Sequence, residues 1–227
     1  MKFFYTSCNI CNKRSKGRIC DDCQTEISLH RKKRKCLQCG RVIEANEESI
    51  CRQCQTEKFN FDIAISVHPY SKAFKEALLD FKFHGGFFRA KIFGKLMGEA
   101  FIRSGLRADY IIPVPMRFWG LRKRGYNPPL EMGYCMKKIV KIPIITNGLI
   151  KTRKTAQQST LTPEERKKNI KGAYKVNRRK INKIKGKEIL LIDDVQTTGS
   201  TISECAKMLK QAGAASVNVI TFLISDY

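Results

Sequence analysis

The sequence contains no long hydrophobic run. No apolar stretch approaches the ~20 residues that span a bilayer, and none near the N-terminus is long enough for a signal peptide. We therefore expect a cytoplasmic protein with no membrane insertion. A length of 227 residues predicts one or two domains, of which one is large enough for a substantial core.

Acidic residues are scarce: 20 Asp and Glu stand against 44 Lys and Arg, a formal net charge of +24. The imbalance is greatest in residues 151–187, which hold 14 basic and 2 acidic residues, whereas residues 188–227 hold 2 and 5. A concentrated basic segment favours a polyanionic partner, either nucleic acid or a phosphorylated small molecule. The alternative is charge on a solvated loop.

Cysteine is scarce beyond residue 54, since eight of the ten cysteines precede it as four Cys-x-x-Cys pairs. Each pair can aim two thiolates at one metal ion. Without a secretion signal, metal sites are favoured over disulfides. The simplest pairing follows the chain and predicts two structural Zn²⁺ sites, although the spacing leaves interleaved pairing open: Cys8, Cys11, Cys20 and Cys23 for the first, and Cys36, Cys39, Cys51 and Cys54 for the second.

The first 60 residues have few large aliphatic side chains, so metal binding must supply much of their folding free energy. We expect a double zinc ribbon at residues 1–60 and a second domain at residues 61–227. A basic run between the two sites is suited to phosphate contacts or, alternatively, is an exposed linker between the ribbons: Arg31, Lys32, Lys33, Arg34 and Lys35.

From about residue 62, strand and helix patterns alternate, which implies a mostly parallel α/β sheet. The apolar run Glu188–Ile192 is typical of a central parallel strand buried on both faces. Helical spacing of apolar residues predicts helices over Ser71–Phe83, Arg89–Ile102, Pro128–Val140 and Thr201–Gln211. Further strands are predicted at Ile63–Val67, Tyr110–Val114, Ile142–Ile145, Leu149–Ile150 and Ser216–Ile224.

The strand at residues 188–192 ends in two carboxylates, Asp193 and Asp194, and continues through a hydroxyl-rich loop into a helix. This loop places hydroxyl and N–H groups at a helix N-terminus, where the helix dipole favours phosphate. The carboxylates follow the strand's C-terminal end, where open α/β sheets bind ligands. They can hold ribose hydroxyls or Mg²⁺. The segment therefore predicts a pocket for a phosphorylated ribose.

The same segment resembles the signature of type I phosphoribosyltransferases that binds phosphoribosyl pyrophosphate (PRPP). The resemblance implies a sheet of that type, PRPP with Mg²⁺ as the ligand, and contacts from Asp193 and Asp194 to the ribose 2- and 3-hydroxyls. Further implied contacts come from this loop and from an earlier loop that approaches the pyrophosphate: Gln196, Thr197, Thr198, Gly199, Ser200 and Thr201, with Pro115, Met116 and Arg117.

In that family a flexible hood usually lies between the two loops, and here the interval contains the basic segment 151–187. Three hood residues are candidates for stabilising a departing pyrophosphate, as closing loops do elsewhere. They are Lys151, Arg153 and Lys154.

The chain as a whole resembles the ComF/ComFC family of bacterial natural competence. One departure is Pro128-Pro129, where Gln and then a small residue are expected. The matching features occur in order along residues 8–224: the Cys-x-x-Cys pairs, Phe81–Gly85, Pro113–Pro115, Arg122–Asn127, Arg153–Leu161, Arg166 with Asn169, and the PRPP loop.

This resemblance implies handling of incoming single-stranded DNA at the cytoplasmic side of the uptake machinery, with proteins of that machinery as further partners. The alternative is an active phosphoribosyltransferase with a nucleobase, amine or ammonia acceptor. The aromatics Phe3–Tyr5 either stack on bases or pack the thin ribbon core. Besides residues 31–35, the candidate nucleic-acid contacts are Arg122, Lys123, Arg124, Arg166, Lys167, Lys168 and Lys171.

Overall fold

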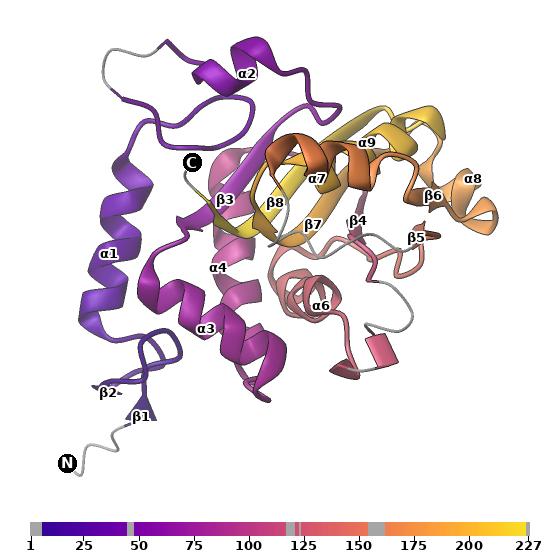
Figure 1. Cartoon of the computed structure of the whole chain (residues 1–227). Helices are drawn as coiled ribbons and strands as arrows, with labels where there is room; N and C mark the ends of the chain where they lie inside the picture. The colour runs from indigo at the N-terminus through magenta and orange to yellow at the C-terminus, as the bar shows by residue number, and fades with distance from the viewer. Residues whose placement is uncertain (1–5, 45–47, 117–120, 123, 154–161, 226–227) are drawn as a thin grey trace.

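A computed structural model describes residues 6–44, 48–116, 121–122, 124–153 and 162–225. Figure 1 shows an N-terminal cysteine-rich part, drawn in indigo and violet, lying along one side of an α/β body. No helix in these ranges has the length and the apolar character needed to cross a bilayer.

A four-stranded parallel sheet in the order β3-β8-β7-β4 forms the centre of the body, which confirms the predicted fold class. The central pair, β7 and β8, is almost entirely apolar and buried, as expected for strands covered on both faces. Parallel pairing places the carboxyl ends of β7 and β4 side by side, with Ile192 opposite Pro113. The strands are β3 (Ala64–Pro69), β4 (Tyr110–Pro113), β7 (Glu188–Gln196) and β8 (Ser216–Ile224).

Helices cover both faces of this sheet (Figure 1). One face, which includes Leu190 and Ile192, packs against α3 (Lys72–Phe83), α4 (Arg89–Ser104) and α6 (Pro128–Val140). The other face, which includes Ile189 and Leu191, packs against α9 (Ser200–Gln211). Because side chains alternate along a strand, Asp193 lies on the sheet face that packs against α9, and Asp194 lies on the face that packs against α3, α4 and α6.

The described parts of the basic segment form short elements beside α9. The strands β5 (Leu149–Lys151) and β6 (Tyr174–Val176) make a separate antiparallel pair. Three buried side chains, Ile170, Tyr174 and Ile184, anchor these elements to the core under α9. The remaining elements are α7 (Pro163–Ile170), the 3₁₀ helix η2 (Arg178–Lys180) and α8 (Ile181–Ile184).

The predicted strand Ile142–Ile145 is wrong, because only an isolated bridge joins Ile144 to Ile111. The N–H of Ile111 donates to the carbonyl of Pro143, and the N–H of Ile145 donates to the carbonyl of Ile111. Pro143 itself has no N–H to donate, which limits the pairing to these two hydrogen bonds before the chain turns. Leu149–Ile150 is a strand as predicted, although it lies outside the central sheet.

The cysteine-rich part is organised by a helix that the sequence analysis missed. This helix, α1 (Asp21–Lys32), connects the small hairpin β1 (Thr6–Ser7) and β2 (Arg14–Ser15) to the second cysteine group, which contains α2 (Arg52–Thr56). The linker alternative for the basic run at residues 31–35 is wrong for Arg31 and Lys32, which form the last turn of α1. The other alternative, contact with phosphate, stays a prediction. Burial of Ile27 and His30 explains the helix, since His30 packs 5.2 Å from the ring of His68.

Candidate functional site

The hydroxyl-rich loop predicted from the sequence, residues 197–199, connects the end of β7 to the first turn of α9. We call it the phosphate loop. Gly199 adopts a left-handed conformation with φ 74°, and α9 begins directly after it. The hydroxyls of Thr198 and Ser200 lie 2.8 Å apart, and the N–H of Ser200 donates to Thr198 Oγ1. The turn is thus held by its own hydroxyls at a helix N-terminus, the geometry that favours an anionic group.

The two carboxylates before this loop have different environments. Asp194 forms an ion pair with Lys82 at 2.8 Å, and the side chains are 15% and 18% exposed. Asp193 is half-buried on the opposite face, and one of its oxygens accepts the N–H of Asp194. Burial raises the pKa of Asp193, and the charge of Asp194 raises it further, against the opposing effects of Lys82 and Lys151.

Lys82 is therefore a site residue that the sequence analysis did not select. It is the penultimate residue of α3, where the helical pattern identified only the apolar positions around it. The motif Phe81–Gly85, which contains Lys82, is the sequence feature from which this residue could have been selected.

The earlier loop follows β4, and the described part of it lies beside β7. Val114 donates its N–H to Ile192, and its carbonyl accepts the side-chain amide of Asn127. The amide oxygen of Asn127 is buried without a hydrogen-bond partner. Pro115 and Met116 are half-buried, whereas Arg117 lies outside the described residues. Asn127 thus offers an unused acceptor next to the predicted pyrophosphate loop, a second residue that we did not select from the sequence.

The three candidate residues of the hood differ in their positions and contacts. Lys151 lies at the end of β5 with its ammonium 5.4 Å from the ring centroid of Tyr174, and its charge acts on Asp193. The guanidinium of Arg153 donates to the carbonyls of Asn169 and Lys171 at 2.8 and 2.9 Å. Lys154 lies outside the described residues. Lys151 is thus the candidate placed near the carboxylates.

The second cysteine group contacts the end of β7, and the segment that follows this group contacts the phosphate loop and α9. Gln196, the last residue of β7, donates its side-chain amide to the carbonyl of Cys39 at 3.2 Å. A Cβ on Gly199 would lie 2.8 Å from the ring of Phe59, so the glycine permits this close approach. Asn60 donates twice, from its N–H and its side chain, to the hydroxyl of Ser203 at 3.0 Å.

The eight N-terminal cysteines form two groups that match the pairing along the chain. In each group the four sulfurs lie within 4.8 Å of one another, with Cys11 and Cys20 at 3.5 Å and Cys39 and Cys51 at 3.6 Å. A tetrahedral site with Zn–S bonds of about 2.3 Å requires sulfur separations of about 3.8 Å, so both groups fit a metal ion. The members are Cys8, Cys11, Cys20 and Cys23, and Cys36, Cys39, Cys51 and Cys54.

Backbone N–H groups support the sulfurs as metal ligands. Cys8 Sγ accepts from Ile10 and Cys20, and Cys36 Sγ accepts from Cys51 at 3.3 Å. Such bonds favour the thiolate over the thiol. Four thiolates leave no coordination position for water, so each group is suited to a structural role.

The nucleic-acid candidates are dispersed over the surface. Arg31 pairs with Glu99 at 3.2 Å, Lys35 is half-buried, and Arg124 stacks on the ring of Phe83. Lys123 and Phe3–Tyr5 lie outside the described residues, and the side chains of Arg166 and Lys167 are likewise not described. The exposed candidates are Lys32, Lys33, Arg34, Arg122, Lys168 and Lys171.

Comparison with known protein families identifies the part of the chain that contains the phosphate loop. The family model named "Phosphoribosyl transferase domain" matches residues 137–225, which include β7, the loop and α9. Among solved structures, one described as the allosteric regulatory enzyme of purine biosynthesis shares 24% identity over 58% of this chain and 25% of its own, with a TM-score of 0.38. This TM-score is too low to indicate a shared fold.

Three curated relatives match over most of their lengths. Competence protein F of Haemophilus influenzae is 26% identical, covering 96% of this chain and 97% of that protein. DNA utilization protein YhgH of Escherichia coli K12 is 27% identical and covers 81% of each. Competence protein ComFC of Bacillus subtilis is 26% identical, covering 84% of this chain and 78% of that protein.

Proposed function

We propose that this chain, a homologue of the ComF/ComFC competence proteins with a phosphoribosyl transferase domain, binds PRPP with Mg²⁺ and handles single-stranded DNA during DNA uptake. It acts on the cytoplasmic side of the uptake machinery. Residues 1–60 form its double zinc module, and residues 61–227 form its ligand-binding domain. The Escherichia coli relative, named for DNA utilization, supports the DNA-related role.

The observation that supports PRPP binding is the pair of carboxylates at the carboxyl end of β7, one of which is paired with a lysine. Asp194 forms an ion pair with Lys82 on one face, and Asp193 lies on the other. The phosphate loop begins directly after them. This arrangement places ribose-hydroxyl acceptors next to a phosphate cradle, with cations close enough to compensate the pyrophosphate charge.

Ligand binding in this pocket requires an exchange at Asp194. Its carboxylate is paired with the ammonium of Lys82, so the ribose hydroxyls displace that ammonium from the carboxylate. The released ammonium then contacts the pyrophosphate. Mg²⁺, when bound with PRPP, neutralises part of the pyrophosphate charge.

Isothermal titration calorimetry with PRPP and Mg²⁺ tests this half of the proposal. We expect a saturable heat for the wild type and none for the Asp193→Asn/Asp194→Asn double variant. Glu76→Gln, at an exposed position of α3, is the matched control and should bind like the wild type. Equal affinities for the double variant and the control would remove both carboxylates from the site.

Fluorescence anisotropy with labelled oligo(dT) tests the DNA half. If binding is electrostatic, the logarithm of affinity should fall with the logarithm of salt concentration, with a slope of about −0.7 per neutralised phosphate. Absence of binding at low salt would reject single-strand handling.

The alternative function is phosphoribosyl transfer to a nucleobase, amine or ammonia. The match to a phosphoribosyl transferase domain over residues 137–225 favours it. Lys151, near Asp193, is then the residue that stabilises the departing pyrophosphate. Pyrophosphate release in the presence of one of these acceptors, lost in Lys151→Met, would establish transfer.

A further inference from the structure

Three exposed phenylalanines lie at the turn between α3 and α4. Phe83, Phe87 and Phe88 are 62%, 47% and 60% exposed, and we call this group the aromatic turn. In contrast, Phe81 and Phe93, in the adjoining helices, are completely buried. Clustered exposed aromatic rings are uncommon on a soluble protein and mark a binding surface.

Contacts beneath the rings hold the aromatic turn in place. Phe87 packs edge-on against Tyr126 with centroids 5.2 Å apart, and the Tyr126 hydroxyl donates to the carbonyl of Phe81. A Cβ on Gly86 would lie 2.2 Å from the carboxylate of Asp80, so this glycine allows the turn to close tightly. The rings are thus presented by a tightly packed turn.

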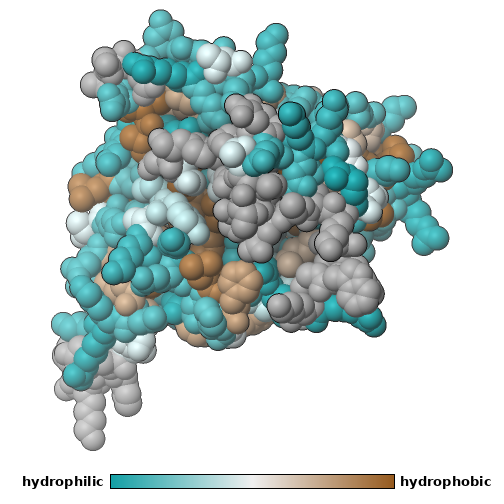
Figure 2. Space-filling view, in the orientation of Figure 1, coloured by the Kyte–Doolittle hydropathy of each residue, from teal (hydrophilic) through white to brown (hydrophobic). Residues whose placement is uncertain are grey.

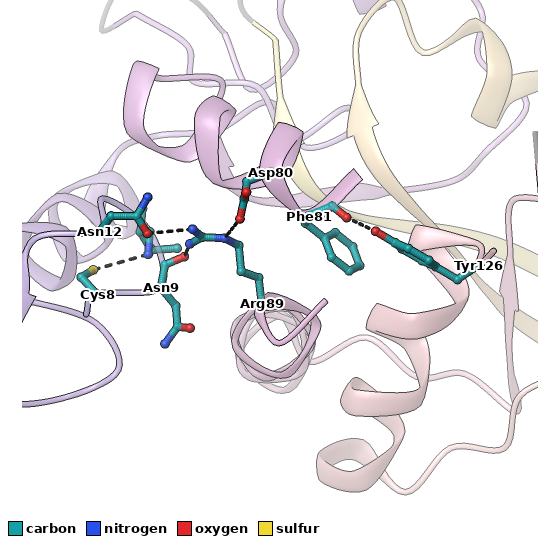
Figure 3. A network of polar contacts seen from close by, with 8 residues as sticks. Cys8, Asn9, Asn12, Asp80, Phe81, Arg89 and Tyr126 are labelled. Carbon is teal, nitrogen blue, oxygen red and sulfur yellow. Dashed lines mark hydrogen bonds and ion pairs between the residues drawn. The ribbon is translucent and has the colours of Figure 1, made fainter. Parts of the chain in front are cut away.

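Arg89 anchors the turn from below and is 2% exposed. Figure 3 shows its guanidinium between Asp80, which accepts at 2.8 Å, and the side chain of Asn12, which also accepts at 2.8 Å. It also donates to the carbonyl of Asn9. The aromatic turn is therefore tied to the first cysteine group, because Asn9 follows Cys8 and Asn12 follows Cys11.

Basic side chains lie around the aromatic turn. Residues 81–98 contain four Lys/Arg and no Asp or Glu, and three of the four form ion pairs with acids outside this range: Lys82 with Asp194, Arg89 with Asp80 and Lys95 with Glu99. The guanidinium of Arg124 lies 4.6 Å from the ring centroid of Phe83, a cation–π distance. Figure 2 shows exposed apolar side chains, in brown and tan, among hydrophilic ones over the region between α3 and α6. Exposed rings combined with arginine are characteristic of surfaces that bind single-stranded nucleic acid.

We propose that the aromatic turn is a base-stacking surface for single-stranded DNA, in which Phe83 and Phe88 stack on bases and Arg124 contacts a backbone phosphate. This inference rests on the proposed single-strand handling and adds the place where the strand binds. Lys82, next to Phe83, holds Asp194 of the predicted PRPP pocket. A strand on the aromatic turn therefore passes beside that pocket.

Charge and ring geometry favour DNA over a protein partner. The chain carries a formal net charge of +24, and such an excess attracts a polyanion, while Arg124 lies directly on the Phe83 ring at the aromatic turn itself. A single strand is favoured over a duplex because its unpaired bases offer their faces to a phenylalanine without the cost of unstacking base pairs. The order of bases should matter little, since every base has a π-face.

Anisotropy titrations with labelled oligo(dT) at several salt concentrations test this inference in the full-length, zinc-loaded protein. We expect Phe83→Ala/Phe88→Ala to weaken binding about 100-fold, from the loss of two base-stacking contacts. The slope of the logarithm of affinity against the logarithm of salt concentration should remain that of the wild type. Arg124→Ala should instead reduce the slope by about 0.7, the contribution of one phosphate to a single strand.

Two further variants separate stacking from apolar contact. Phe83→Leu/Phe88→Leu keeps an apolar surface and should bind as weakly as the alanine variant, whereas Phe83→Trp/Phe88→Trp should bind at least as tightly as the wild type. Tyr134→Ala on α6 and Arg107→Ala before β4 are matched controls at exposed positions and should change nothing. Circular dichroism of each variant checks the fold.

The outcomes distinguish this inference from the proposed function. If the wild type binds oligo(dT) and the alanine variant binds equally well, the aromatic turn is not the stacking surface, while single-strand handling stands. If the leucine variant binds like the wild type, the rings act as an apolar contact and the stacking inference is wrong. If the wild type does not bind, both the inference and single-strand handling fail.

Discussion

The side-chain amide of Gln196 donates a hydrogen bond to the backbone carbonyl of Cys39 across 157 positions of the sequence, at 3.2 Å. Cys39 belongs to the second cysteine group, and Gln196 directly precedes the phosphate loop. A metal ion held by the Cys39 thiolate and its neighbouring ligands would help to fix the position of this carbonyl. The second metal site therefore supports the loop, although it does not line the pocket.

Loss of the second metal should weaken ligand binding more than loss of the first. We expect Cys36→Ser/Cys39→Ser to lower PRPP affinity at least tenfold, because the loop loses its support from Gln196 and from the segment at Phe59. Cys8→Ser/Cys11→Ser is the matched control, since no described contact joins that group to the loop. Calorimetry gives the affinity and elemental analysis the zinc content. Equal losses of affinity would contradict a specific link.

Gly199→Ala should destabilise the protein for two separable reasons. The left-handed conformation costs about 1–2 kcal/mol for a non-glycine residue, and the new Cβ would meet Phe59. Gly172→Ala, which has a similar positive φ but open space around it, should show only the first cost. Thermal unfolding measures both, and Phe59→Ala should recover part of the loss in Gly199→Ala. Identical melting temperatures for the two glycine variants would show that the Phe59 contact is unimportant.

Lys82→Met should destabilise the protein by about 3 kcal/mol, because it leaves the largely buried carboxylate of Asp194 without its cation. The double variant Lys82→Met/Asp194→Asn should recover most of this loss, since it removes both charges. Lys13→Met, which breaks an ion pair on the surface, is the control and should change little. Urea denaturation measures the free energy of unfolding. A double variant as unstable as Lys82→Met would show that the cost does not come from the unpaired charge.

Asp193 should make the protein less stable as pH rises. Burial and the charge of Asp194 raise its pKa, so the folded state holds the proton more tightly than the unfolded chain. The free energy of unfolding therefore falls as pH rises from the ordinary aspartate range near 4 toward the raised value. Asp193→Asn should remove this fall and raise the free energy of unfolding near neutral pH relative to the wild type.

Denaturation of Asp193→Asn and the wild type across pH checks this prediction, with Glu76→Gln as the exposed control. Parallel curves for Asp193→Asn and the wild type would mean that Asp193 titrates as an ordinary carboxyl.

The sequence by itself determined the features whose residues are neighbours in the chain. The four Cys-x-x-Cys pairs identified the metal ligands because two ligands of one ion lie within a single turn. The apolar run, the two acids and the hydroxyl-rich loop identified β7 and its phosphate loop because the strand, loop and helix follow one another. The helical period also predicted the helix over Ser71–Phe83 correctly, and Phe81 is buried on its apolar face, since burial repeats along one face of a helix.

Only the tertiary structure decided the contacts between distant residues. Lys82 meets Asp194 and Gln196 meets Cys39 because the parallel sheet brings α3 and the second cysteine group to the same end of β7. The exposure of Phe83 likewise depends on which helices pack nearby, since its residue type alone predicts burial. Helix α1 was missed because its cysteine-rich, polar sequence carries a weak apolar period, and packing of Ile27 and His30 stabilises it.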